Sequence, residues 1–127
     1  MRTFITIIAF LSLGYQVDIQ AQENHDILTP QEFCDKIESE DVQIIDVRTP
    51  KEYKNGHIKN STLINFFDDD FKEQLSKLPK DEEILVYCRS GNRSGKAFKI
   101  LEDLGYENIS DLKGGMLLWE KSKTDCH

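Results

Sequence analysis

Short apolar segments alternate with capped helical segments along this chain, and this alternation restricts its fold more than any other feature of the sequence. Four segments have the length and apolar content of short strands: 42–45, 61–65, 83–87 and 108–112. Helical segments separate them, and two open with a capping box and a proline at the first helical position, at Thr29–Glu32 and Thr49–Glu52. This pattern predicts an α/β domain, with a parallel sheet covered by helices on both faces.

The clearest strand, 83–87, leads into the clearest helix, 94–104, through a loop that contains a cysteine. Apolar residues recur at helical spacing in that helix, and Gly105 follows it as a C-terminal stop. In parallel sheets, ligands bind at the carboxyl ends of strands, where loops lead into helices. The loop at 88–93 therefore occupies the expected position of a site.

The first 21 residues have the order of features found in a secretory signal peptide. Arg2 gives a basic start, residues 4–13 form an apolar run too short to span a membrane, and Ala21 is a small residue at the expected cleavage position. The alternative is a buried N-terminal helix or strand. We expect a signal peptide at 1–21, a single domain at 22–127, and a periplasmic or secreted location.

The charge balance is acidic, with 16 Lys and Arg residues against 23 Asp and Glu residues and a net charge of −7. Cleavage after Ala21 would remove Arg2 and Asp18 and leave that net charge unchanged. Nucleic acids and anionic membranes both need a basic surface, so neither is an expected partner. The remaining chain of about 106 residues is long enough for one core, and we expect a monomer.

The chain contains three cysteines, Cys34, Cys88 and Cys126, so at least one is unpaired or pairs between molecules. Three cysteines are too few for a disulfide scaffold. Cys34 lies in a predicted helix among apolar residues and is expected to be a buried free thiol. Cys126, close to the C-terminus, is expected to be mobile. Neither this tail nor the acidic run at 68–70 is expected to bind a metal.

The loop itself, CRSGNRS at 88–94, places a thiol where a strand ends and a helix begins. Glycine and asparagine allow main-chain N–H groups to point inward, and the following helix adds its free N–H groups and positive dipole end. Such surroundings favour the thiolate form of a cysteine and also bind an anionic substrate. The alternative is a structural turn that happens to contain cysteine, but plain packing does not need two arginines beside it.

This loop resembles the active-site loop of single-domain rhodaneses, which are sulfurtransferases. Two further stretches are similar to the family's motifs in the same order, IIDVRTPKEYKNGHI at 44–58 and LKGGMLLW at 112–119. The resemblance covers about residues 27–121. It implies the family's three-layer fold, with a five-stranded parallel sheet between helices.

The resemblance also implies roles for the loop residues. Cys88 would be the nucleophile that becomes a persulfide, and main-chain N–H groups of the loop would surround its sulfur. The residues that would complete the loop are Arg89, Ser90, Gly91, Asn92 and Arg93. The two arginines could steer a small anionic donor such as thiosulfate, and the acceptor would be a thiol or cyanide. No metal or organic cofactor is implied.

Several other polar residues are expected to be structural. Asp46 and Arg48 end a predicted strand near the loop, and Arg48 is expected to form an ion pair with Glu52 on the next helix. His57 is expected to be structural, because a thiolate stabilised by the loop needs no general base. Trp119 is expected in the core or at its rim.

Two other functional classes stay open. One is a thiol phosphatase or arsenate reductase, which would use the same thiol and anion-binding loop. Such enzymes have five residues between cysteine and arginine, whereas four residues separate Cys88 from Arg93 and the next residue is Ser94. The other class is a non-catalytic binding module, which the presence of Cys88 disfavours.

Overall fold

The structure, a computed structural model, describes Gly14 and residues 25–126. The predicted signal peptide therefore lies outside the described residues, apart from Gly14. The strands are β1 (Ile27–Leu28), β2 (Val42–Asp46), β3 (Thr62–Leu63), β4 (Glu83–Tyr87) and β5 (Ile109–Leu112). The helices are α1 (Pro30–Ser39), α2 (Pro50–Lys54), α3 (Phe71–Ser76), α4 (Asn92–Asp103) and α5 (Gly115–Lys121). Among the described residues, no helix has the length and hydropathy needed to cross a bilayer.

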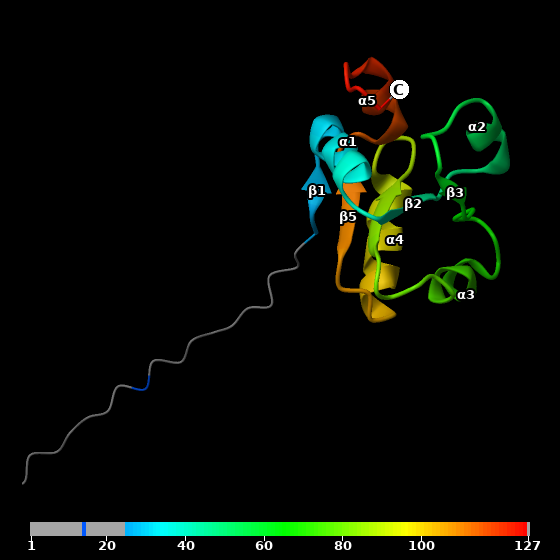
Figure 1. Cartoon of the computed structure of the whole chain (residues 1–127). Coiled ribbons are helices and arrows are strands. Elements are labelled where there is room, and N and C mark those ends of the chain that lie inside the picture. The colour runs from blue at the N-terminus through cyan, green and yellow to red at the C-terminus, as the bar shows by residue number, and fades with distance from the viewer. Residues whose placement is uncertain (1–13, 15–24, 127) are drawn as a thin grey trace, which may run out of the picture.

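The strands form one sheet in the order β1-β5-β4-β2-β3, and every neighbouring pair is parallel (Figure 1). The predicted five-stranded parallel sheet is therefore confirmed. β1 was not among the four segments identified from the residues, because it pairs through Ile27 and Leu28 alone. Two residues are too few to show a strand's periodicity.

Helices cover both faces of the sheet, which confirms the three-layer α/β fold. One core cluster packs α3 and α4 against the sheet, and the other packs α1 and α5 against the opposite face. Alternate residues of β4 enter different clusters, with Ile84 and Val86 in the first and Leu85 and Tyr87 in the second. Trp119 is in the second cluster and is 2% exposed, so its predicted place in the core is confirmed.

Both predicted capping boxes are present. At the start of α1, the Glu32 N–H donates to Thr29 Oγ1 and the Thr29 N–H donates to the Glu32 carboxylate. Thr49 and Glu52 make the same reciprocal bonds at the start of α2. Proline at the first helical position fixes the backbone there, so the sequence signal was sufficient for both helix starts.

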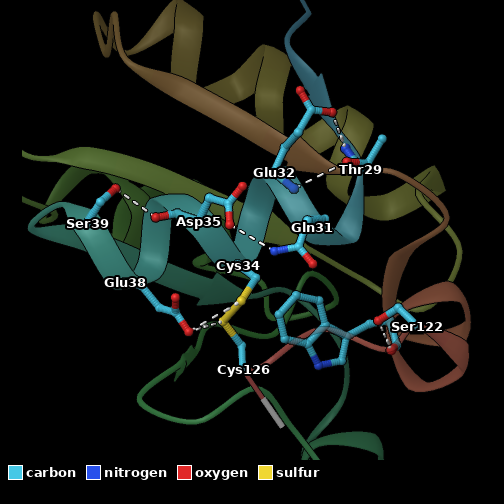
Figure 2. Close-up of a disulfide and its surroundings, with 10 residues drawn as sticks. Thr29, Gln31, Glu32, Cys34, Asp35, Glu38, Ser39, Ser122 and Cys126 are labelled. Atoms are coloured by element: carbon cyan, nitrogen blue, oxygen red, sulfur yellow. Dashed lines mark hydrogen bonds between the residues drawn. A yellow bond between two sulfur atoms is a disulfide. The ribbon is translucent and has the colours of Figure 1, made fainter.

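The structure corrects the expectation for two cysteines, because Cys34 and Cys126 form a disulfide across 92 positions of the sequence. The chain after α5 returns to α1, which brings the two Cα atoms to 5.7 Å (Figure 2). Predictions of a free thiol at Cys34 and a mobile Cys126 were therefore wrong. Glu38 lies beside both sulfurs, but a disulfide offers no thiolate to a metal.

Candidate active site

Cys88 lies directly after β4, at the carboxyl end of a central strand, and its side chain is 1% exposed. It is the free cysteine of the described chain, in agreement with an odd number of cysteines. The Gly91 N–H donates to Cys88 Sγ at 3.1 Å, and the thiol donates to Ser94 Oγ at 3.3 Å. The sulfur therefore faces a main-chain donor and a hydroxyl at the start of α4.

Helix α4 begins at Asn92, two residues before the predicted start. Gly91 is its N-cap and has a φ of +112°, in the left-handed region that favours glycine. This geometry turns the chain sharply enough for the Gly91 N–H to point back at the Cys88 sulfur. Asn92 and Arg93 are consequently in the first helical turn, where unpaired N–H groups and the helix dipole favour an anion.

The turn Gly114–Gly115 holds the other side of the loop. The Met116 N–H donates to Cys88 O at 2.8 Å, and the Leu117 N–H donates to Arg89 O at 3.1 Å. A Cβ atom on Gly115 would lie 2.5 Å from Cys88 O, so this close approach requires glycine. The sequence signal was visible in the Gly-Gly pair, which we interpreted only as a turn.

Arg93 and Glu52 form a pair with two hydrogen bonds, from Arg93 Nη1 at 2.7 Å and Nη2 at 3.0 Å. The pKa of Glu52 is lowered from 4.5 to about 2, and the hydrogen bonds from Arg93 are the largest cause. The predicted ion pair between Arg48 and Glu52 is therefore wrong. Glu52 lies on the helix that follows Arg48 in the sequence, but its partner Arg93 comes from an element 41 residues away.

Arg48 instead contacts Asp46, the last residue of β2. Its Nε and Nη2 donate to the Asp46 carboxylate at 2.7 to 3.1 Å, and Nη2 also donates to Gly56 O at 2.7 Å. Both side chains are buried, and the guanidinium lies 5.6 Å from the centre of the Tyr87 ring. The pair joins the end of β2 to the turn after α2, which agrees with a structural role.

A groove of about 180 Å³ lies beside the loop, between α2 and α5. Arg48, Arg89, Met116 and Leu117 are among the residues that line it. Arg89 is exposed, so its guanidinium is accessible to an incoming anion. A larger hollow of about 560 Å³ lies against α3, but no residue of the Cys88 loop lines it. Arg89 of that loop lines the smaller groove, so we place the site there.

The structure brings the predicted site residues to one end of the sheet. Cys88 is buried beneath the loop, whereas Arg89, Ser90 and Asn92 are exposed. His57 is exposed and stacks on the ring of Tyr53 at 3.6 Å, outside the loop. Sequence reasoning did not identify Ser94, which lies against the sulfur, as a member of the site.

The fold and the loop together define a class: a three-layer parallel α/β domain that presents a cysteine at a helix N-terminus. Residues 29–122 match the model of the rhodanese-like domain. The chain belongs to the rhodanese-like family.

Three related proteins illustrate this membership. A protein of Allochromatium vinosum named sulfurtransferase is 34% identical over 84 residues, which cover 66% of this chain and 77% of the relative. A tRNA uridine(34) hydroxylase of onion yellows phytoplasma is 33% identical over 116 residues, 83% of this chain but 38% of that longer protein. The crystal structure of a rhodanese-related protein from Thermoplasma volcanium has a TM-score of 0.70 at 30% identity, and covers 79% of this chain and 95% of its own.

Proposed function

We propose that this protein is a sulfurtransferase in which Cys88 carries sulfane sulfur as a persulfide. The donor is a small anion such as thiosulfate or a polysulfide, and the acceptor is a thiol or cyanide. Family membership and the sulfurtransferase name of a relative support transfer of sulfur in general. The groove beside exposed Arg89 supports an anionic donor.

The observation that carries the proposal is the contact between the Gly91 N–H and Cys88 Sγ at the N-terminus of α4. A main-chain donor and a helix dipole both favour a negatively charged sulfur. The thiolate, and equally the terminal sulfur of a persulfide, is such a group. Because Cys88 is buried, oxidants in solution have limited access to the persulfide before the acceptor reacts with it.

The reaction has two balanced steps. The Cys88 thiolate attacks the outer sulfur of the donor, the sulfur–sulfur bond of the donor breaks, and its electron pair leaves on the donor remainder, which is sulfite for thiosulfate. The acceptor then attacks the terminal sulfur of the persulfide, and Cys88 leaves as a thiolate. Because the enzyme carries sulfur between the steps, the kinetics should be ping-pong.

A phosphatase activity has less support from the same loop. Ser94 is at the position where thiol phosphatases have the arginine that clamps the phosphate. It is fully buried and contacts the Cys88 sulfur. Arg93, one residue earlier, uses both of its terminal nitrogens on Glu52. Neither residue offers a free bidentate clamp for a phosphoryl group.

One preparation can test both activities. We expect thiosulfate or polysulfide to load sulfur on the protein, and we expect no measurable hydrolysis of an aryl phosphate. Cys88→Ser should lose the sulfur transfer. Phosphatase turnover that depends on Cys88, without formation of a persulfide, would contradict the proposal.

We propose further that the protein works in the periplasm or outside the cell. The disulfide between Cys34 and Cys126 supports this location, because structural disulfides persist mainly in oxidising compartments. The sequence order of residues 1–21 supports it independently. A free, buried Cys88 is compatible with an oxidising compartment. Cys88 belongs to the core cluster with α3 and α4, whereas Cys34 and Cys126 belong to the cluster on the opposite face of the sheet.

A further inference from the structure

Three polar side chains lie one after another in space behind the Cys88 loop, from the sulfur toward solvent. They are Ser94, Asp111 and His25. The Cys88 thiol donates to Ser94 Oγ at 3.3 Å. Ser94 lies beside Asp111 on β5, and His25 Nε2 lies 3.0 Å from Asp111 Oδ2. The reaction proposed above uses none of the three.

Asp111 is a buried acid without a complete set of partners. It is 3% exposed, and its Oδ1 makes no hydrogen bond of standard geometry with any described residue. Burial raises the pKa of Asp111, and hydrogen bonding with Ser94, His25 and the Leu112 main chain opposes that rise. A buried carboxylate with one unpaired oxygen is costly, so Asp111 is sensitive to the charge and hydrogen bonds of its neighbours.

His25 forms the outer end of the series. Its ring packs against Phe98 of α4, with ring centres 4.2 Å apart, and its side chain is 31% exposed. Solvent can therefore reach the imidazole, whereas Cys88 and Asp111 are buried. Histidine is the side chain that most often changes charge near neutral pH.

We propose that Asp111 and His25 are positioning residues that control the ionisation of Cys88 through Ser94, so that protonation of His25 favours the thiolate. This inference rests on the proposed function in one respect, because it treats Cys88 as the nucleophile. It adds a pH-sensitive control of that nucleophile.

The single hydroxyl proton of Ser94 explains the direction of the effect. In the structure this proton is directed to Gly91 O at 3.3 Å, and Asp111 and a Cys88 thiolate are the competing acceptors. When His25 is protonated, its charge balances Asp111, and Ser94 is free to donate to the thiolate. When His25 is neutral, the Asp111 anion attracts the Ser94 proton and repels a second anion.

Other groups that face these residues do not supply the same control. Arg93 is near enough to Cys88 to interact with its charge, but its guanidinium is paired with Glu52. Arg89 is exposed. Beside the His25 ring lie the Asp111 carboxylate, the apolar ring of Phe98 and the uncharged Gly95. The sign of the coupling therefore follows from Asp111 and His25.

The test is the rate of Cys88 alkylation by iodoacetamide as a function of pH, measured on the full protein without reductant. The disulfide removes Cys34 and Cys126 from the measurement, so the rate reports Cys88. We expect His25→Gln to slow alkylation about threefold or more at pH values near 6, where an ordinary histidine is mostly protonated. We expect Asp111→Asn to accelerate it, because the variant lacks the repelling charge.

The matched control is His57→Gln, since His57 is an exposed histidine that contacts Tyr53 and not the Cys88 loop. It should follow the wild-type profile. The double variant His25→Gln/Asp111→Asn should behave like Asp111→Asn, because His25 acts through that carboxylate. Unchanged or inverted effects of His25→Gln would overturn the proposal.

A second measurement does not depend on the folding of the Asp111 variant. Coupling between two titrating groups is reciprocal. The nuclear magnetic resonance signals of the His25 ring should therefore change their pH response in Cys88→Ser, while those of His57 should not. An unchanged His25 response would overturn the proposal. Neither measurement uses a sulfur donor, so lost turnover with intact coupling would reject the proposed function and not the coupling.

Discussion

Arg93 Nη1 and Nη2 donate to the two carboxylate oxygens of Glu52 at 2.7 and 3.0 Å, and this pair joins the first turn of α4 to α2. Glu52 also closes the capping box of α2 with Thr49. One carboxylate therefore fixes a helix start and an arginine of the Cys88 loop. A change at Glu52 should affect both.

We predict that Glu52→Gln destabilises the fold by about 1–2 kcal/mol, less than the pKa shift alone suggests because solvent partly screens the pair. The pKa of Glu52 is lowered from 4.5 to about 2 in the folded protein. This stabilisation is thus complete above about pH 4.5 and is lost as pH falls toward 2. Urea unfolding across this pH range measures it, and the stability difference between wild type and variant should shrink at the acidic end. A difference that is constant with pH would contradict the pairing.

A second prediction concerns the turn that holds the loop carbonyls. Gly115→Ala should lose most sulfur transfer, because the new Cβ would meet Cys88 O and the Arg89 main chain at 2.5 to 2.6 Å. Gly105→Ala is the matched control. It also has a positive φ, of +92°, but its Cβ would approach only the flexible end of Lys80. Both variants should lose stability, by about 1 kcal/mol or more, and only Gly115→Ala should lose activity. Equal activities would contradict a specific role for Gly115.

The disulfide gives a third prediction. Cys34→Ser/Cys126→Ser should lower the free energy of unfolding by roughly 2–4 kcal/mol, because the disulfide closes a long loop in the unfolded chain. Sulfur transfer at moderate temperature should persist, since Cys88 is in the other core cluster. Thermal unfolding with and without reductant provides the measurement. Reductant should lower the melting temperature of the wild type and leave that of the double variant unchanged. Loss of turnover as complete as in Cys88→Ser would instead assign a chemical role to the pair.

Export is a fourth prediction. In a Gram-negative host, the chain should be exported and cleaved near Ala21, because a basic start, an apolar core and a small residue occur in the required order. The intact mass of the exported protein measures the cleavage position. A cytoplasmic product that keeps Arg2 would contradict it.

The sequence was sufficient for features that depend on neighbouring residues. The proline-containing capping boxes at Thr29 and Thr49 and the apolar run of β4 are local signals, and the structure confirms each. Gly91 also carried a local signal, although its left-handed conformation starts α4 earlier than the apolar periodicity indicated.

Features that depend on contacts between distant elements were harder to predict. Arg48 has two carboxylates nearby in the sequence, Glu52 four residues later and Asp46 two residues earlier. The burial of Asp46 beside Arg48 decides the pairing, and the sequence does not show that burial. Arg93 reaches Glu52 from 41 positions away, and Cys34 reaches Cys126 from 92. Their proximity follows from the order of the strands and the return of the chain after α5. No spacing rule contains that information.

The most direct test of the central claim is the intact mass of the desalted protein, with its Cys34–Cys126 disulfide kept intact, after exposure to thiosulfate or polysulfide. We predict the addition of one sulfur atom to wild type, its location on the peptide that contains Cys88, and its removal by an acceptor thiol or cyanide. Cys88→Ser should gain none. If donors of both kinds leave Cys88 without added sulfur, or if the sulfur is added equally in Cys88→Ser, the assignment of Cys88 as a sulfur-carrying nucleophile is contradicted.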